Sequence, residues 1–519
     1  MAAKLCIKLI ALERGITCIG LRRISALVKS KYPNTTTYIY DLAALSSKKY
    51  LKSWILSRAP KTIETSINEK LVEELAQADV LGLSCVSLDA DQAKQLINLV
   101  KKKNPKILVV WGGVHATVNP EDAINHADIV CIGEGEKSIV ALLNKIEQKG
   151  DFSTLKGLWV RESGRVLKND LMSLMSEDEL SQMPFQDYGF DIKYVTHNSM
   201  EFMTKSVYMS ILGSTYNTMW VMGCPYHCSY CSNNKFLAIN IEYGKLRHAR
   251  AEFIIEELIE VRKRYSHIKY VVFNDDNLSI LSKEKLKHFA ELWRSKIGLP
   301  FFVPGFSPPT VDPEKVDILV NAGMNKLRMG IQSGSERMLD FYGRKTSRQQ
   351  ILKSAEILAS FYPKISPPNY DILIDNPIET KQDKEATLSL LRELKRPFML
   401  YVYSLRKLPG TRLWDFALEH PEYDFKPYSR SFQFVDDRWM GIMVYMLGIY
   451  NPPESAYRLW NVLAKNKRVS QVLFPLVRIG YLIKRFYYEV KTSNFEEIAK
   501  VSPAIAKVAL KMRLIFKYF

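Results

Sequence analysis

Short apolar runs alternate with amphipathic helical patterns over residues 1–150. The runs are rich in Val, Ile and Leu, as expected of parallel strands that are covered on both faces. Between them, Leu21, Ile24 and Val28 show the three- and four-residue spacing of an amphipathic helix. This alternation predicts a doubly wound parallel sheet, that is, a Rossmann-like α/β domain. Its predicted strands are Leu5–Leu12, Thr36–Leu42, Val80–Ser84, Ile107–Trp111 and Ile129–Ile132.

A second α/β alternation occupies residues 201–420. Six strand–helix units are too few to close an eight-stranded barrel, so the pattern predicts an open, partial (β/α)6 TIM barrel. Residues 151–200 are predicted to be a linker, and residues 421–519 a mainly helical, basic and aromatic-rich domain. The predicted barrel strands are Asn217–Met222, Tyr270–Asn274, Phe301–Gly305, Lys326–Ile331, Tyr370–Ile374 and Met399–Leu405.

Three cysteines, Cys224, Cys228 and Cys231, follow the first barrel strand, and no cysteine lies downstream of them. A structural zinc site normally has four protein ligands, and an electron-transfer 4Fe-4S cluster usually has four thiolates. Three ligands leave one coordination position for a small molecule, which favours a catalytic site over a structural one. The alternative is a zinc-stabilised binding module without catalytic activity, in which His227 or His248 completes the site.

Polar residues follow several other predicted strands, at the edge where parallel sheets bind their ligands. In the barrel they include Asp375–Thr380 and the site candidates Asn274, Asp275, Asp276, Gln332 and Ser333. Asp275 and Asp276 also fit an ordinary helix N-cap or turn pair. In the first domain, small-residue loops favour a bound cofactor over plain turns, although no Gly-x-Gly-x-x-Gly opens the first helix. These candidates are Ser84, Ser87, Gly112, Gly113, His115, Gly133, Glu134 and Gly135.

The formal charge of +18 is spread over helix faces, which favours a solvated basic surface, and no nucleic-acid partner is expected. Seven cysteines, an odd number, indicate a reduced compartment. No signal peptide or membrane-spanning run is evident, so we expect a cytoplasmic protein. Residues 473–487 combine apolar and basic side chains in a helical pattern. This helix is predicted either to pack on the barrel or to contact a membrane surface or lipid-like substrate.

The three-cysteine motif, with Tyr230 directly before Cys231, resembles the signature of the radical S-adenosylmethionine (SAM) superfamily, and residues 5–415 resemble its cobalamin-dependent branch. The resemblance implies a 4Fe-4S cluster on Cys224, Cys228 and Cys231, with SAM at its open iron. It further implies that Tyr230 lies near the adenine, that Asn274–Asp276 contact the methionyl amino group, and that Gln332 and Ser333 contact the ribose. Relatives often have Gly-x-Pro-Gly-Glu-Thr where this chain has Asp375–Thr380, without either glycine.

By the same resemblance, the loops of the first domain, including Gly112, Gly113 and Gly133–Gly135, bind cobalamin. The Asp-x-His-x-x-Gly motif is absent, so His115 is expected to be a polar loop residue and not a cobalt ligand. The implied reaction is methylation of an unactivated carbon or phosphorus of a small molecule or peptide, with electrons from a donor such as flavodoxin or ferredoxin. The alternative is a radical rearrangement or oxidation without methyl transfer.

Overall fold

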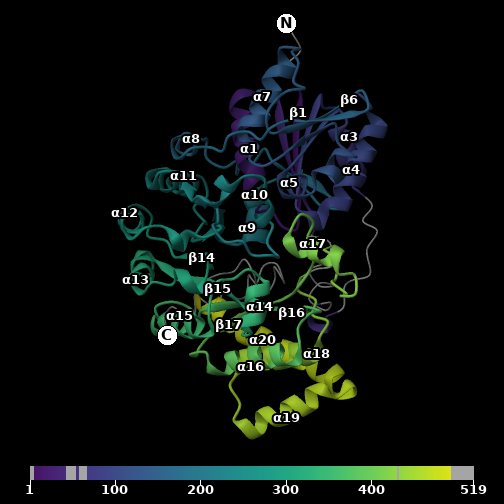
Figure 1. The fold of residues 1–519 in the computed structure, drawn as a ribbon. Helices are drawn as coiled ribbons and strands as arrows, with labels where there is room; N and C mark the ends of the chain where they lie inside the picture. Colours follow the sequence, from purple (N-terminus) through teal and green to yellow (C-terminus); the bar gives the residue numbers. More distant parts are fainter. Residues whose placement is uncertain (1–4, 43–53, 58–66, 429–431, 493–519) are drawn as a thin grey trace.

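Two sheets, one above the other, organise the computed structural model, which describes residues 5–42, 54–57, 67–428 and 432–492 (Figure 1). The N-terminal sheet has nine strands and the second sheet has six. Helices α18, α19 and α20 lie beyond the second sheet, at the end of the molecule opposite the N-terminal sheet. They span Arg438–Ile449, Glu454–Lys465 and Lys467–Thr492.

The five predicted N-terminal strands form a parallel sheet in the order β5-β4-β3-β1-β2, which confirms the doubly wound α/β fold. The strands are β1 (Ile7–Glu13), β2 (Thr35–Asp41), β3 (Val80–Cys85), β4 (Leu108–Gly112) and β5 (Ile129–Cys131). Their helices are α1 (Ile19–Lys31), α3 (Glu69–Leu75), α4 (Ala90–Lys103), α5 (Gly113–Val118), α6 (Pro120–Ile124) and α7 (Glu136–Glu147).

The segment predicted as a linker extends this sheet at both edges. The hairpin β6–β7 pairs antiparallel with β5, and β8–β9 joins the opposite edge beside β2. Composition alone does not distinguish such edge strands from a linker, because their exposed positions are polar. They are β6 (Leu158–Glu162), β7 (Arg165–Lys168), β8 (Lys193–Val195) and β9 (Met200–Phe202).

The second sheet is wholly parallel, its strands follow chain order, and no pairing joins its first and last strands in the part of the chain that is described. The predicted open barrel of six strands is therefore confirmed. Its strands are β10 (Thr215–Thr218), β13 (Tyr270–Phe273), β14 (Phe301–Phe306), β15 (Met324–Gln332), β16 (Asn369–Ile374) and β17 (Met399–Ser404). The predicted strand Asn217–Met222 splits into β10 and β11 (Val221–Met222), and β11 pairs with β12 (Arg247–His248).

Helices cover the outside of the barrel, and the helical elements nearest the site follow the strand ends. The outer helices are α9 (Lys205–Leu212), α11 (Ala251–Arg264), α12 (Lys283–Leu292), α13 (Pro313–Ala322), α15 (Arg348–Ser360) and α16 (Lys381–Glu393). Those nearest the site are α10 (Asn233–Ile239), the 3-10 turn η2 (Ile241–Gly244), α14 (Glu336–Phe341) and α17 (Arg412–Glu419).

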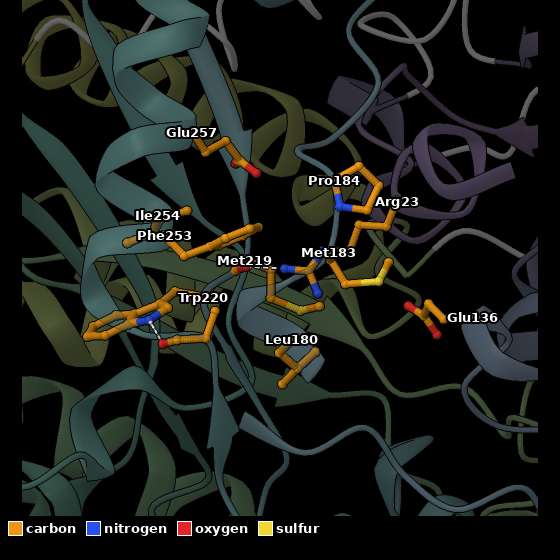
Figure 2. Close-up of a pocket in the computed structure, with 11 residues that line it drawn as sticks. Arg23, Glu136, Leu180, Met183, Pro184, Met219, Trp220, Phe253, Ile254 and Glu257 are labelled. Carbon is orange, nitrogen blue, oxygen red and sulfur yellow. Dashed lines mark hydrogen bonds between the residues drawn. The ribbon is translucent and has the colours of Figure 1, made fainter. Parts of the chain in front are cut away.

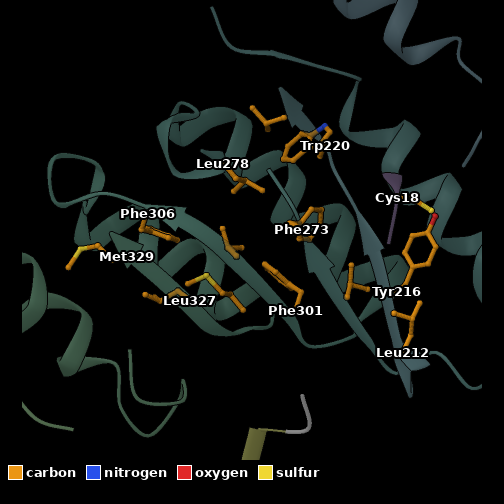
Figure 3. Packing of buried hydrophobic residues seen from close by; sticks show 14 of the residues in the cluster. Cys18, Leu212, Tyr216, Trp220, Phe273, Leu278, Phe301, Phe306, Leu327 and Met329 are labelled. Carbon is orange, nitrogen blue, oxygen red and sulfur yellow. The ribbon is translucent and has the colours of Figure 1, made fainter. Parts of the chain in front are cut away.

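One hydrophobic core joins the two sheets. Figure 3 shows Phe273 and Phe301 packed between barrel strands and helices, with ring centroids 5.6 Å apart. The same cluster of buried residues includes Trp220 beside the cysteine loop and Cys18 of the N-terminal domain. The α/β domain and the barrel therefore pack as a continuous interior, which fixes their facing edges relative to each other.

Candidate functional site: the cysteine loop and the facing glycine turns

The cysteine loop begins at Gly223 and is held by backbone contacts from distant segments. Gly223 has a φ of +99°, and a Cβ there would lie 2.3 Å from the carbonyl oxygen of Lys245. The amide of Cys224 donates to the carbonyl of Tyr243 at 3.3 Å, and the amide of Ser229 donates to the carbonyl of Tyr342 at 3.0 Å. The loop geometry is thus fixed by η2 and by the end of α14.

Asp275 and Asp276 also fasten this loop. One carboxylate oxygen of Asp276 accepts the amide of Gly223 at 3.2 Å, and the other accepts the Asn233 side-chain amide at 2.9 Å. Asp275 is buried and accepts the amide of Trp220 at 2.7 Å; burial raises the pKa of its carboxyl to about 7. The side chain of Asn274 donates to the side-chain oxygen of Asn217 at 3.1 Å. The described contacts of these three side chains are thus made to the protein around the loop.

The three thiols lie close enough to interact electrostatically, and burial raises the pKa of Cys224 to about 11 and of Cys231 to about 12. Iron binding replaces such thiol protons. Within the described ranges, no three His, Cys, Asp or Glu side chains are gathered as ligands of one metal ion. His248, the alternative zinc ligand, contacts the Ala249 carbonyl at 2.8 Å and the Lys285 ammonium at 2.6 Å. Because both ring nitrogens of His248 are engaged, the three thiols on one loop fit a multi-iron cluster better than a zinc ion completed by His248.

Arg344, which sequence reasoning missed, lies against this loop. Its guanidinium donates to the Gly330 carbonyl at 2.7 Å, and it lies 3.4 Å from the Tyr230 hydroxyl and 3.7 Å from the Cys228 sulfur. The sequence offered only the preceding glycine, Gly343, as a hint of a close contact here. In the structure Gly343 has a φ of +67°, and a Cβ on it would clash with the His227 carbonyl. Tyr230, predicted near the adenine, thus shares the guanidinium of Arg344 with Cys228.

Two non-glycine residues adopt left-handed backbone at adjacent strand ends, Gln332 with a φ of 72° after β15 and Asp375 with a φ of 63° after β16. Such strain concentrates at functional sites. Asp375 stands at the first glycine position of the related motif and keeps the conformation that glycine favours. Its carboxylate accepts the amides of Asp436 and Asp437 at 2.8 and 2.7 Å, which offsets part of the strain.

Two further polar residues at the barrel strand ends differ in whether their side chains are free to contact a ligand. Ser333 is fully buried, and its hydroxyl lies 3.1 Å from that of Thr387 and accepts the Ser335 amide at 3.1 Å. Ser333 thus shapes the turn. Glu379, a second residue that was not predicted as a site residue, has no hydrogen-bond partner for either carboxylate oxygen among the described residues, and burial raises its pKa to about 8.

In the N-terminal domain, the turns after β3, β4 and β5 lie at one edge of the parallel sheet. Gly113 has a φ of +85°, and a Cβ there would lie 2.5 Å from the Ser84 hydroxyl, whereas a Cβ on Gly112 would meet nothing closer than 3.7 Å. Gly133 has a φ of +80°, and Gly135 precedes α7. Only glycine therefore fits at Gly113 and Gly133, at the edge of the sheet where parallel sheets bind their ligands.

His115 is fully buried below this edge and makes two hydrogen bonds. Its Nδ1 lies 3.1 Å from the Ser87 hydroxyl and its Nε2 lies 3.0 Å from the Asp122 carboxylate. Burial lowers the pKa of His115, while Asp122 opposes the shift. Both ring nitrogens and the Ser87 hydroxyl are therefore engaged with the protein. The expectation of a polar loop residue is wrong in its placement, because His115 lies inside α5 and is fully buried there.

Glu134 and Tyr243 join the two sites. The Tyr243 hydroxyl accepts the Glu134 amide at 3.2 Å, and it would lie 2.2 Å from a Cβ on Gly133. Arg247 donates to both carboxylate oxygens of Glu134, at 2.5 and 3.1 Å. Because the Tyr243 carbonyl also holds Cys224, one residue connects the turn after β5 with the cysteine loop. We name these contacts of Tyr243 and Arg247 with Glu134 the interdomain clasp.

A small cavity between the two domains is not a cofactor site. Figure 2 shows it between Arg23 and Glu136 of the N-terminal domain and Trp220 and Glu257 of the barrel. Its volume of about 20 Å³ suits a water molecule and not a cofactor. Arg23 crosses it to donate to the Met219 carbonyl. This cavity therefore belongs to the interface between the domains.

Comparisons with known families match this architecture. The Radical SAM superfamily model matches residues 220–391, and the B12 binding domain model matches residues 57–143. Residues 220–391 therefore form a domain of the radical SAM superfamily, and residues 57–143 form a B12 binding domain. The first match includes the cysteine loop and the strand ends to β16, and the second includes the turns at Gly113 and Gly133.

Two curated relatives and a solved structure resemble between 50% and 83% of the chain. An uncharacterised methyltransferase of Pyrococcus horikoshii is 25% identical over 345 residues, 66% of this chain and 69% of that protein. Cytidylyl-2-hydroxyethylphosphonate methyltransferase of Streptomyces wedmorensis is 24% identical over 289 residues, and the chain spans only 51% of its length. The structure of the radical SAM methyltransferase TsrM from Kitasatospora setae, with cobalamin and a [4Fe-4S] cluster bound, aligns with a TM-score of 0.60 at 13% identity, covering 83% of this chain and 82% of TsrM. At that identity the likeness shows the fold.

Proposed function

We propose that this protein is a cobalamin-dependent radical SAM methyltransferase that methylates an unactivated carbon or phosphorus of a small molecule or peptide. The observation that carries the proposal is the interdomain clasp, because it brings the loop of Cys224, Cys228 and Cys231 next to the Gly133 turn of the B12-binding domain. Methyltransferase relatives support this reaction. When bound, the cluster and SAM would supply a radical, and cobalamin would carry the methyl group.

The residues of this chain would bind and orient these groups. Cys224, Cys228 and Cys231 would hold the cluster, and the turns at Gly113 and Gly133 would support the corrin. Gln332 is the better ribose contact, because its side chain lies over Gly330 beside Arg344, whereas the Ser333 hydroxyl is already bonded within its turn. Asp275 and Asp276 would act mainly by holding the cysteine loop, because their carboxylates already accept hydrogen bonds from it and from the residues just before it. The methionyl amino group of SAM would then be bound by backbone atoms near Asn274.

An acidic electron carrier such as flavodoxin fits the outside of the cysteine loop. A surface cavity of about 380 Å³ is lined there by His227, Asp340, Arg344, Lys345 and Arg412. Lys345 and Arg412 form no ion pair with a residue that the structure describes, and Arg344 separates the cavity from Cys228. A positive surface with a short path to the cluster favours an anionic donor.

The electron-donor proposal is tested with Lys345→Glu and Arg412→Glu. We expect both to slow flavodoxin-driven formation of 5'-deoxyadenosine, with little effect when dithionite is the reductant. Equal rates with flavodoxin in the variants and the unchanged protein would exclude this docking site. Loss of both reactions would instead indicate damage to the cysteine loop.

The reaction itself is tested by anaerobic reconstitution, iron, sulfide and cobalt analysis, and product mass. Bound iron and cobalt, formation of 5'-deoxyadenosine, and a product heavier by one methylene unit are expected. Intact iron without affinity for hydroxocobalamin would reject the cobalamin half of the proposal. Cleavage of SAM with a product of unchanged or lower mass would favour rearrangement or oxidation instead.

A further inference from the structure

Helix α20 is apolar on its exposed side as well as on its buried side, where Phe474, Val477 and Tyr481 belong to the core. Five large apolar residues are among its most exposed: Val472 (63%), Leu476 (57%), Ile479 (40%), Ile483 (66%) and Tyr487 (58%). Their spacing of three or four residues places them on one face of the helix. A surface helix normally directs such a face inward. The exposed face of α20 therefore lacks the polar cover that water favours.

The charged residues in the middle of α20 point toward the protein instead. Arg478 is fully buried, with its guanidinium 3.6 Å from the ring centroid of Trp54. Glu489 pairs with Lys326 at 2.5 Å, and both side chains are buried. Lys484 donates to the Gly448 carbonyl at 2.7 Å. Arg478, Lys484 and Arg485 thus contact the barrel and α18 and do not form the outer surface, which confirms the predicted packing of this helix on the barrel.

Exposed cations flank the apolar face at its two ends. Lys465, Lys467 and Arg468 are exposed where α19 meets α20, and Lys491 is exposed near the end of α20. The only acidic residue of α20 is the buried Glu489. Helix α19, which packs beside α20, adds the exposed apolar residues Leu459 (58%) and Val462 (68%). The occupant of this surface is therefore apolar and carries negative charge at its boundary.

We propose that the outer face of α20, from Val472 to Tyr487, binds the surface of an anionic membrane, with the helix lying in the interfacial plane. An apolar face buried at the headgroup boundary with flanking cations is the pattern of interfacial helices. The described helices include none that could cross a membrane, so the contact is peripheral. Residues 493–519 carry five Lys or Arg and two Glu. Because that segment has the same sign of charge as the rim, it is a poorer partner for the face than an anionic lipid surface.

The test is vesicle flotation of the full chain, with vesicles of phosphatidylcholine alone or mixed with phosphatidylglycerol. We expect flotation with the anionic vesicles, weaker flotation with the neutral ones, and release at high salt. Leu476→Glu combined with Ile483→Glu is expected to weaken binding by about tenfold or more, because two apolar contacts are replaced by charges that repel the lipid. Leu418→Glu, at an exposed apolar residue of α17, is the matched control and should float normally.

Iron content and thermal unfolding show whether the double variant is folded. A folded double variant that binds anionic vesicles as tightly as the unchanged protein overturns the proposal. So does failure of the unchanged chain to float. Binding only after removal of residues 493–519 would show that this segment covers the face. A dimer that the double variant dissociates, without vesicle binding, would assign the face to a second copy of the chain.

Discussion

The cysteine loop and the glycine turns of the B12-binding domain are built in opposite ways. The loop takes its shape from partners far away in the sequence, since Tyr243, Tyr342 and Asp276 each hold part of its backbone. The turns take their shape from their own backbone, through the positive φ of Gly113 and Gly133. The loop is thus supported from outside, whereas the turns depend on glycines whose missing Cβ leaves room for the Ser84 and Tyr243 hydroxyls.

The largest expected effect comes from removing the loop ligands. Replacing Cys224, Cys228 or Cys231 with Ala is expected to abolish bound iron and 5'-deoxyadenosine formation, because the remaining two thiolates cannot retain the cluster. Cobalamin binding should persist, since the turns do not depend on iron. Cys6→Ala is the control, because Cys6 lies outside both sites. Loss of cobalamin in the loop variants, measured by its absorbance, would show that the two sites are not independent.

Gly113→Ala is the converse experiment. Its Cβ would lie 2.5 Å from the Ser84 hydroxyl in a left-handed backbone, at a cost of about 1–3 kcal/mol. We expect cobalamin affinity to fall by about tenfold while iron content is unchanged. Gly112→Ala is a matched control, because its Cβ would meet ordinary contacts from 3.7 Å outward. Equal cobalamin binding by both variants contradicts the role of close backbone approach.

The strands and the cysteine loop were predictable from the sequence, but the interdomain clasp was not. Apolar runs predicted strands β1 to β5 and the six barrel strands, because buried parallel strands have a strong pattern, but not the edge strands β6 to β9. The three cysteines predicted the loop. Tyr243 and Arg247 carried no such signal, since their partners Cys224 and Glu134 are set by the packing of two domains. The left-handed backbone at Asp375 had a partial signal, because the resemblance places a glycine of the related motif at this position.

Asp275 supports the cysteine loop, and its buried carboxyl makes the free energy of unfolding depend on pH. Its folded pKa of about 7 lies above the usual value near 3.9 for an unfolded Asp, so the folded state holds the proton more tightly. Stability should therefore fall as pH rises from about 4 to about 7 and show no further decline from this group above that. Nearby Asp276 and Arg23 act on the same carboxyl in opposite directions. Asp275→Asn should remove this slope in denaturant unfolding; an unchanged slope assigns it to another group.

Gln332 allows strain and binding to be separated. Gln332→Ala and Gln332→Gly both remove the amide that would contact the ribose, so both should weaken SAM binding equally. Only Ala retains the left-handed strain at a φ of 72°, so the Gly variant should be more stable by about 1–2 kcal/mol. Isothermal titration and thermal unfolding measure the two quantities. Unchanged SAM affinity in both variants would assign Gln332 a structural role alone.

The smallest expected effect tests the interdomain clasp itself, at the contact between Tyr243 and Gly133. A Cβ at Gly133 would lie 2.2 Å from the Tyr243 hydroxyl but 3.5 Å from the ring carbon that carries it. Tyr243→Phe should therefore relieve Gly133→Ala, with a coupling free energy of about 1 kcal/mol between the two changes. The pair Gly113→Ala and Tyr243→Phe should be additive, because Tyr243 does not contact Gly113. If the first pair is also additive in unfolding and in cobalamin affinity, the turn and the cysteine loop move independently. A measured coupling would mean that the Tyr243 hydroxyl contacts the Gly133 turn in solution, so that this tyrosine links the turn to the cysteine loop.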